Sequence, residues 1–459
     1  MAKAQVFVAA LLLVAQATAN AYDGALDIAF GFLGEVELTP TGMAADAPSY
    51  AKLSVDGQHR IVGCIRTLSP ANTTVPWIFR LTPDGGNDTS FAGTGSKFVA
   101  IPSGASYLSC DGFAVYPDGR ILLASYDGSN QYILRMKADG GPDTSFNGTG
   151  TLTIARTGNS NDFIDDAVVA SDGSVYIAYS RATANGARFL VRHILDNGTV
   201  DGGFGPGGGG ATLFDGFALK TGVTARDDYP SRILLTREGS VVVTGHTTPT
   251  TSGNSDFAAA RLTSTGLPDS GFGSSGAVIV ALDLGYNNAD LANSSALDER
   301  GRLVMAGYAQ RTNASNLDFA VVRLDTGGVP DTTFSGDGKT TIAFDLGGVG
   351  EDVATSVAVQ TDGRILVGGY AHHASGSSAF DWAVARLLDN GALDGTFNGT
   401  GKETFAVDLG GDKNDFLYSV VADGSDFILM GESSATATTE AAILARLRID
   451  LIFASQFGG

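Results

Sequence analysis

The chain contains few of the residues from which metal centres and nucleophilic sites are usually built. Its 459 residues include 2 cysteines, 5 histidines and 2 tryptophans. The histidines fall at unrelated positions of the chain, and neither an H-E-x-x-H nor a G-x-S-x-G motif occurs. We therefore identify no catalytic residue from the sequence.

Positive charge is also scarce. Lysine and arginine together number 29 against 49 aspartates and glutamates, which gives a formal net charge of −20. A surface of this sign repels nucleic-acid phosphates and anionic lipid headgroups. We expect neither as a partner. The acidity fits a soluble exported protein, and an acidic site for cations is the alternative.

Only one long apolar run is present. The ten residues VFVAALLLVA (6–15) follow Lys3 and precede the small residues Ala19 and Ala21. This run is too short to span a bilayer and is typical of a Sec-type signal peptide. We expect residues 1–21 to be removed and the chain from residue 22 to be secreted or periplasmic, with no membrane span.

The two cysteines are Cys64 and Cys110. Export permits a disulfide between them. Two free, half-buried thiols are the alternative, and a metal site would need ligands that the sequence does not supply.

What the chain does contain is a repeat. The phrase D-x-x-F stands at Asp27–Phe30, Asp88–Phe91, Asp143–Phe146, Asp201–Phe204, Asp269–Phe272, Asp331–Phe334, Asp394–Phe397 and Asp450–Phe453. Successive phenylalanines are 55 to 68 residues apart. Each interval also has one arginine that closes an apolar run, at Arg80, Arg135, Arg192, Arg261, Arg323, Arg386 and Arg446. Eight anchors therefore enclose seven units.

Each unit carries four short strand signals. In 334–397 these are KTTIAFDL, TSVAVQ, RILVGGY and DWAVARL, with an Asp-Gly turn between the second and the third. No convincing helical periodicity occurs. Four-stranded units at a period of about 60 residues predict an all-β, seven-bladed β-propeller of four-stranded antiparallel blades. A β-solenoid or a string of sandwiches is the alternative.

The predicted propeller occupies residues 22–459. Its approximate blade boundaries are 26–88, 89–143, 144–201, 202–269, 270–331, 332–394 and 395–453. Because the first and last anchors fall at the same place on a closed ring, we expect the two chain ends to meet there. We also expect the first strand of each unit to be the innermost.

The phrases GLPDSGFG, DGRILVGG and LDFAVVRL resemble the delta-60 repeat of exported bacterial proteins. The resemblance extends over residues ~26–453, because the motifs recur in the same order. The last predicted strand in each of the first three units departs most from the delta-60 pattern. The resemblance implies a propeller-like fold and export, and it implies no activity, because that family is largely without assigned function.

Arginine and the following anchor aspartate recur at a constant spacing of eight residues. These pairs are Arg80/Asp88, Arg135/Asp143, Arg261/Asp269, Arg323/Asp331 and Arg386/Asp394, and the spacing is nine in Arg192/Asp201. Residues two before each arginine are apolar, so the arginine lies on a packed surface where its charge needs a partner. We predict a structural ion pair in each blade. Anion binding by the arginines is the alternative.

A second carboxylate pattern precedes the central hairpin. It comprises Asp46, Asp162, Asp228, Asp290, Asp352 and Asp415, with Leu108 in the second unit. Three units also read D-L-G-x4-D and add Asp283, Asp345 and Asp408. These acids form a predicted acidic rim, where oxygen ligands would suit calcium. Alternatively, each aspartate caps its own loop.

The sequence therefore supports three functions. The first is a non-enzymatic exported propeller that recognises a glycan or a protein through its acidic, loop-variable face, since varied loops on a regular scaffold often bind ligands. The second is a carboxylate-dependent hydrolase or lyase, with or without calcium, at the tunnel mouth. The third is a purely structural element of the cell surface.

Overall fold

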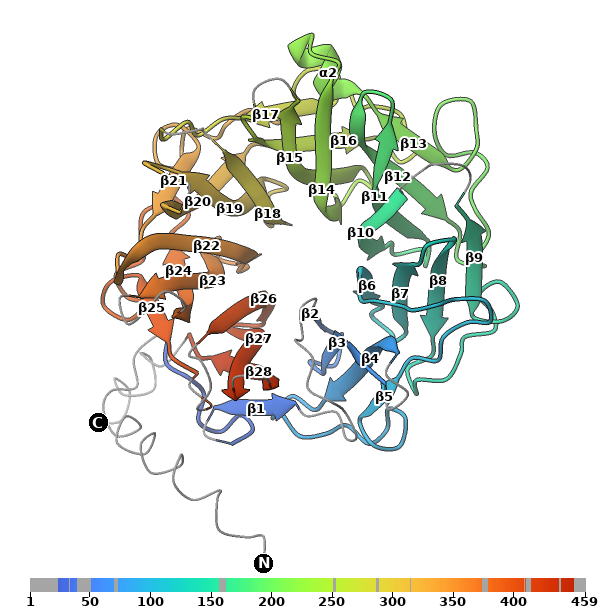
Figure 1. Cartoon of the computed structure of the whole chain (residues 1–459), viewed down its shortest axis with the longest axis horizontal. Helices are drawn as coiled ribbons and strands as arrows, with labels where there is room; N and C mark the ends of the chain where they lie inside the picture. The colour runs from blue at the N-terminus through green and yellow to red at the C-terminus, as the bar shows by residue number, and fades with distance from the viewer. Residues whose placement is uncertain are drawn as a thin grey trace, which may run out of the picture.

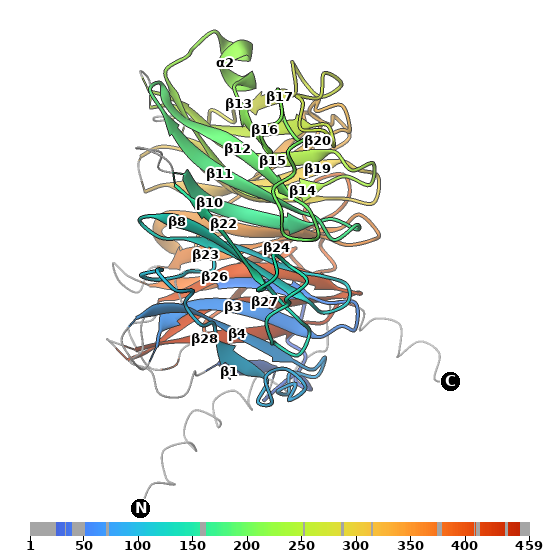
Figure 2. The ribbon, with the colours of Figure 1, turned by 90° about the vertical axis from the view of Figure 1, so that its right-hand side faces the viewer.

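The chain forms antiparallel sheets arranged in a ring around one axis (Figure 1), and seen from the side the ring is a disc (Figure 2). The computed structural model describes residues 24–32, 34–38, 51–69, 73–156, 162–250, 253–285, 289–313, 315–373, 379–407, 409, 414–436 and 439–449. The short helix α2 (Gly216–Thr221) lies at the periphery. No helix of the described part is long and apolar enough to cross a membrane.

Four of the sheets are built from consecutive strands in the order of the chain. The first contains β2 (Ala51–Val55), β3 (Ile61–Leu68), β4 (Thr74–Leu81) and β5 (Ser96–Phe98). The second contains β6 (Gly112–Val115), β7 (Ile121–Tyr126), β8 (Asn130–Met136) and β9 (Thr151–Ala155). The third contains β10 (Asp162–Val169), β11 (Val175–Thr183), β12 (Gly186–Ile194) and β13 (Ala211–Phe214). The fourth contains β14 (Arg226–Leu235), β15 (Val241–Pro249), β16 (Asp256–Leu262) and β17 (Ala277–Val280).

A further four-stranded sheet closes the ring with both ends of the chain. It contains β26 (Asp415–Asp423), β27 (Asp426–Thr436), β28 (Thr439–Leu447) and β1 (Glu35–Leu38). Strand β1 pairs with β28 from Glu35↔Ala445 to Leu38↔Ala442. The chain ends therefore meet as expected, although the last anchor, Asp450–Phe453, lies outside the described residues.

The remaining strands form one eight-stranded sheet. These are β18 (Asp290–Leu297), β19 (Leu303–Gln310), β20 (Leu317–Leu324), β21 (Lys339–Ile342), β22 (Gly347–Val359), β23 (Ile365–His373), β24 (Phe380–Leu387) and β25 (Lys402–Phe405). Two antiparallel groups of four are joined where Leu317 of β20 pairs in parallel with Glu351 of β22.

The all-β propeller is confirmed, but the prediction of seven separate four-stranded blades is wrong. Five four-stranded sheets are separate, and the other strands are continuous through the eight-stranded sheet. The cause is the length of β22: its residue Glu351 pairs with β20 between two stretches that pair with β23, one at Gly347 and one from Asp352 onwards. Repeat spacing predicts strands within a unit, but it does not report backbone pairing between neighbouring units.

The strand that follows each anchor lies at the outer edge of a sheet, not at the axis. Within the unit 334–397, residues Lys339–Ile342 form β21, which pairs with β20 of the preceding anchor-to-anchor unit. The strands nearest the axis are β2, β6, β10, β14, β18, β22 and β26 (Figure 1). Each sheet therefore begins one strand later than the anchor-to-anchor units imply.

The core lies between neighbouring sheets. One apolar cluster joins Val321 and Phe334 to Val367 and Ala383 across the eight-stranded sheet, and similar clusters fill the other sheet-to-sheet contacts. Strand β20 is buried at every position. Such strands are apolar on both faces because each sheet is covered on both sides.

Candidate functional site

The predicted arginine–aspartate pairs lie within ion-pair distance. The Nε–Oδ2 distances are 2.7 Å in Arg80–Asp88, 2.7 Å in Arg135–Asp143, 2.7 Å in Arg261–Asp269, 2.9 Å in Arg323–Asp331 and 2.9 Å in Arg386–Asp394. Each guanidinium also lies 4.6 to 5.1 Å from the ring centre of the anchor phenylalanine. These five arginines are therefore engaged in the framework of the ring.

One unit uses a histidine instead. His193 Nδ1 lies 2.9 Å from the Asp201 carboxylate, and the imidazole stacks on Tyr176 with 4.1 Å between ring centres. The prediction that Arg192 pairs with Asp201 is therefore wrong. Strand alternation explains the difference, because neighbouring residues of β12 point to opposite faces and only His193 faces the anchor.

Cys64 and Cys110 form a disulfide, and both residues are 0% exposed. Cys64 belongs to β3 of the first sheet, and Cys110 precedes β6 of the second. The bond therefore joins two neighbouring sheets.

The acidic rim is directed into the protein rather than towards solvent. Its described members, Asp162, Asp228, Asp290, Asp352 and Asp415, are each at most 3% exposed. Asp46 lies outside the described residues.

Three of these carboxylates close backbone loops. Oδ2 of Asp352 accepts a hydrogen bond from the Phe344 amide at 2.7 Å, and Oδ2 of Asp415 accepts one from Val407 at 2.8 Å. Oδ2 of Asp290 accepts one from the Leu282 amide at 2.7 Å. The loop-capping alternative accounts for these contacts.

The other two rim carboxylates pair with arginines. Asp162 binds Arg181 of β11, with an Nε–Oδ1 distance of 2.7 Å. Asp228 lies 3.0 Å from the Arg226 Nε.

Among the residues that the structure describes, one cluster of three carboxylates could hold a cation. Asp256, Asp283 and Asp290 bring one oxygen each to within 4.8 Å of one another. Burial, followed by the charges of Asp283 and Asp290, raises the pKa of Asp256 to about 6. The next repeat brings Asp345 near Asp318, where Arg311 lies 2.9 Å from the Asp318 carboxylate. Asp408 lies outside the described residues.

A different set of residues surrounds the axis. Five of the innermost strands contain a β-bulge, where one extra residue interrupts the pairing. The extra residues are Asp165, Ser231, Asn293, Thr355 and Tyr418. Bulges bend a strand and redirect side chains, and they often occur beside functional sites.

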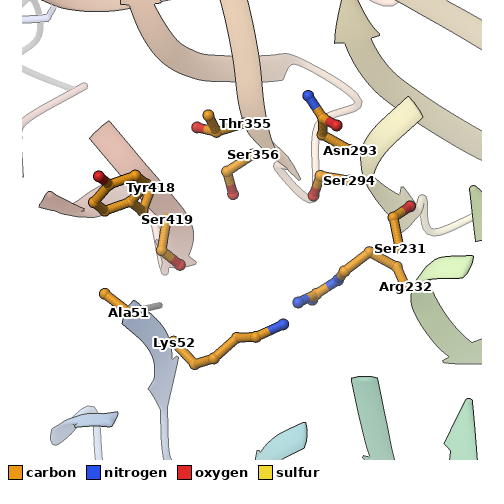
Figure 3. A pocket seen from close by; sticks show the side chains of 10 residues that line it. All are labelled: Ala51, Lys52, Ser231, Arg232, Asn293, Ser294, Thr355, Ser356, Tyr418 and Ser419. Carbon is orange, nitrogen blue, oxygen red and sulfur yellow. The ribbon is translucent and has the colours of Figure 1, made fainter. Parts of the chain in front are cut away.

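Two adjoining pockets, each of about 400 Å³, use these bulges as walls. The first pocket is lined by Ala51, Lys52, Ser231, Arg232, Asn293, Ser294, Thr355, Ser356, Tyr418 and Ser419 (Figure 3). The second is lined by Lys52, Arg66, Tyr107, Ser109, Asp111, Tyr126, Phe163, Ile164, Asp165, Pro230 and Ser231. We call the two pockets together the axial chamber.

The hydroxyl and amide side chains on one side of the chamber form hydrogen bonds with the backbone of neighbouring strands. The Asn293 amide donates to the Ala354 carbonyl at 2.8 Å, and the Thr355 hydroxyl donates to the Leu417 carbonyl at 2.6 Å. The Ser356 hydroxyl accepts a hydrogen bond from the Val420 amide at 2.9 Å. These bonds cross from one group of strands to the next and hold the wall of the first pocket in place.

The opposite side carries two partly buried carboxyl groups, Asp111 and Asp165. Asp111 accepts a hydrogen bond from Ser125 at 2.9 Å, and Asp165 accepts one from Ser180 at 2.7 Å. Burial raises the pKa of Asp111 to about 6 and the pKa of Asp165 to about 7. Raised carboxyl pKa values in a pocket are a frequent property of functional sites.

The raised pKa of Asp165 predicts a pH-dependent cost to stability. The native state keeps this proton up to about pH 7, whereas the unfolded chain loses it near pH ~4. Stability therefore falls as pH rises across that interval. We expect Asp165→Asn to raise the free energy of unfolding at pH 8 by about 2 kcal/mol, because the amide stays neutral but is still a buried polar group.

Urea denaturation at pH 4 and pH 8 measures this effect. The gain should largely vanish at pH 4, where the native carboxyl is protonated and the unfolded carboxyl is about half protonated. An equal gain at both pH values would show that Asp165 does not titrate as described.

Aromatic rings line the second pocket beside these carboxyls. Tyr107 and Phe163 are 37% and 39% exposed, which is high for large apolar side chains. Tyr126 meets Phe163 edge to face, with 5.3 Å between ring centres. The chamber therefore combines exposed rings with carboxyl, hydroxyl and ammonium groups.

Sequence reasoning did not identify the axial chamber. A signal was nevertheless present, because each bulge residue stands three positions after a member of the rim pattern, as in Asp162 and Asp165. The repeat at this position changes from Asp to Ser, Asn, Thr and Tyr along the chain. Such variation at a constant structural position is typical of a binding surface on a repeated scaffold.

Four segments match the family model described as "Domain of unknown function (DUF5122) beta-propeller", at residues 117–146, 239–272, 301–334 and 360–397. These segments support a β-propeller repeat family of unknown function, and the delta-60 name stays a prediction. No curated protein matches the chain.

The chain is also similar to solved structures. One is a protein of unknown function from Dyadobacter fermentans, with 11% identity, coverage of 91% of this chain and 98% of that chain, and a TM-score of 0.42. The Dos1 propeller has 10% identity, 90% and 93% coverage, and a TM-score of 0.44. The propeller domain of the Trilobed protease from Pyrococcus furiosus has 10% identity, 89% and 99% coverage, and a TM-score of 0.44.

Proposed function

We propose that this protein is a binding propeller that recognises a glycan in the axial chamber. One observation carries the proposal: exposed aromatic rings stand beside a pocket of hydroxyl and charged groups. Sugars present apolar C–H faces that stack on such rings, and their hydroxyls need hydrogen-bond partners like those of the wall. Export to where glycans occur rests on the predicted signal peptide and stays a prediction.

This proposal moves the ligand from the predicted loop-variable face to the axis. Residues 251–252, 314 and 374–378 of the variable loops lie outside the described part of the chain. Recognition of a protein at those loops remains the alternative. Calcium at the carboxylate group of Asp283 and Asp290 also stays a prediction.

The aromatic residues provide the test. We expect Phe163→Ala and Tyr126→Ala each to weaken binding of a glycan selected on an array by about five- to tenfold, because one aromatic contact contributes about 1 kcal/mol or more. Isothermal titration calorimetry with the selected oligosaccharide measures the loss. Phe32→Ala is the matched control, because Phe32 is 72% exposed and lies outside the chamber.

Two outcomes contradict the proposal. One is that no glycan on the array binds, and the other is that the chamber variants bind as the wild type does. Repeating the titration in EDTA and in calcium separates a calcium requirement from the contribution of the rings.

The two protonatable carboxyls favour a second candidate, the hydrolase predicted as the alternative. Glycoside hydrolysis uses one carboxyl that protonates the glycosidic oxygen and a second that activates water or attacks the sugar. Asp111 and Asp165 supply two such groups in one pocket. Chromatography of the oligosaccharide after incubation with the protein distinguishes the candidates. A binding protein leaves the oligosaccharide intact, whereas a hydrolase cleaves it into fragments. The Asp165→Asn variant of a hydrolase should produce no fragments.

A further inference from the structure

Two cationic side chains meet in the first pocket. Lys52 of β2 and Arg232 of β14 point their head groups towards each other, so that the two cationic groups lie side by side in the pocket (Figure 3). Their side chains are 22% and 38% exposed. The two residues are 180 positions apart in the chain, so only the closed ring brings them together.

One carboxylate serves both cations. Asp166 Oδ1 lies 3.5 Å from the Lys52 Nζ, and Asp166 Oδ2 lies 3.5 Å from the Arg232 Nε. Both distances exceed the roughly 2.7–2.9 Å usual for charge-assisted hydrogen bonds. Oδ2 also accepts a hydrogen bond from the Ile233 amide at 3.1 Å, so Asp166 divides its charge between two cations and a backbone amide.

Arg232 is not satisfied by this arrangement. Its Nε is buried and makes no hydrogen bond to any described residue. The guanidinium is therefore only partly neutralised by Asp166, and its exposed part can contact a bound anion. The Asp166 side chain is only 3% exposed and is not among the residues that line either pocket, so it does not cover the cations.

The rest of the first pocket carries no opposing charge. Its other described lining residues are alanine, serines, threonine, asparagine and tyrosine. Two positive charges against one shared negative charge leave an excess of positive charge in the first pocket of a chain whose net charge is −20. A cleft of one sign attracts ligands of the opposite sign.

We propose that the first pocket binds an anionic group of the glycan, a carboxylate or a sulfate ester, between Lys52 and Arg232. This inference rests on the proposed glycan binding and assigns the ligand to the acidic sugars. The acidic group pairs with the two cations, and the sugar ring extends towards the aromatic side chains of the second pocket.

The second pocket makes this binding depend on pH. Lys52 lines both pockets, and the charged and titratable groups around it are Arg66, Asp111, Asp165, Asp166, Arg232 and the tyrosines Tyr107, Tyr126 and Tyr418. Asp111 and Asp165 gain protons as the pH falls, which removes negative charge beside Lys52. A sugar carboxylate or sulfate stays ionised at pH 5, so binding should tighten between pH 8 and pH 5.

Calorimetry with trigalacturonic acid and its methyl ester tests the charge directly, because the ester keeps the sugar and removes the anion. We expect the wild type to bind the acid at least tenfold more tightly than the ester at pH 6. Lys52→Gln and Arg232→Gln should abolish this preference, whereas Lys137→Gln, at an exposed site outside the chamber, should retain it. A galactose 6-sulfate oligosaccharide shows whether sulfate replaces carboxylate.

Arg232→Lys guards against a purely structural effect, since it keeps the charge and should keep most of the preference. Equal affinity for acid and ester in the wild type would overturn the inference while leaving glycan binding intact. If no sugar binds, sodium sulfate provides an independent readout at constant ionic strength. A rise in melting temperature that Arg232→Gln removes would support the anion site without a glycan, and no rise would overturn it.

Discussion

Replacing Arg323 by alanine is expected to lower the free energy of unfolding by about 3 to 5 kcal/mol, the usual cost of leaving a buried charge without its partner. Arg323 is 1% exposed, and its Nε lies 2.9 Å from Asp331. Its terminal nitrogens reach the Asp389 carboxylate at 2.9 Å and the Thr333 hydroxyl at 3.0 Å. The side chain thus ties β20 to its own anchor and to the turn after β24, so its loss affects two groups of strands.

Arg300→Ala is the matched control. Arg300 also pairs with Asp389, at 3.1 Å, but its side chain is 69% exposed. An exposed ion pair contributes about 0 to 1 kcal/mol, so this variant should unfold nearly as the wild type does. Guanidinium denaturation followed by tryptophan fluorescence provides the comparison. Wild-type stability of both Arg323→Ala and Asp331→Ala would contradict a structural role for the pair.

Removal of the disulfide should have an effect of similar size. The bond between Cys64 and Cys110 encloses a separation of 46 residues. In the chain-entropy account, a loop of this length stabilises the native state by about 4 kcal/mol, because it restricts the unfolded chain. We expect the Cys64→Ala/Cys110→Ala variant to lose about that amount in guanidinium denaturation.

Reduction of the wild type separates the covalent bond from the loss of packing. Both sulfurs lie in the apolar cluster between the first two sheets, with Val62, Ile78 and Leu123. Wild type unfolded in dithiothreitol should therefore lie between the oxidised protein and the double variant. If the reduced and oxidised proteins unfold at the same guanidinium concentration, the bond contributes nothing to stability.

The repeat predicted those contacts that depend on local spacing. A strand arginine and its anchor aspartate, eight residues apart, meet because a tight turn returns the chain to the end of the same strand. Arg323 and Asp331 illustrate this, as the Asp331 amide donates to the Arg323 carbonyl at 2.9 Å. Where the inward-facing position of the strand shifts by one residue, as at His193, spacing alone predicts the wrong partner for the anchor aspartate.

Spacing along the chain did not predict the strand pairs that form between neighbouring repeats. The strand at Lys339–Ile342 follows an anchor in sequence, yet it pairs backwards with β20. Turns and apolar strand signals precede and follow this strand in the chain, so the sequence does not show which neighbouring strand it pairs with. The same ambiguity concealed the parallel bridge between Leu317 and Glu351.

The rim aspartates show a related limit. The pattern correctly identified carboxylates at a repeated position, but it could not show that Asp290 and Asp352 turn inwards to accept backbone amides. Capping of a loop and exposure on a rim require the same residue type. The direction of the side chain decides between them, and that direction follows from the path of the loop.

By itself, the sequence determined the all-β class, the four-stranded unit, the structural ion pairs and the apolar strands, because each depends on residues close together in the chain. Tertiary structure decided which strand lies at the axis, how neighbouring groups of strands join, and which residues share the axial chamber. Lys52, Asp166 and Arg232 belong to three different sheets. They meet only because the ring closes, and although the repeat predicted that closure, it does not show which side chains the closed ring brings together.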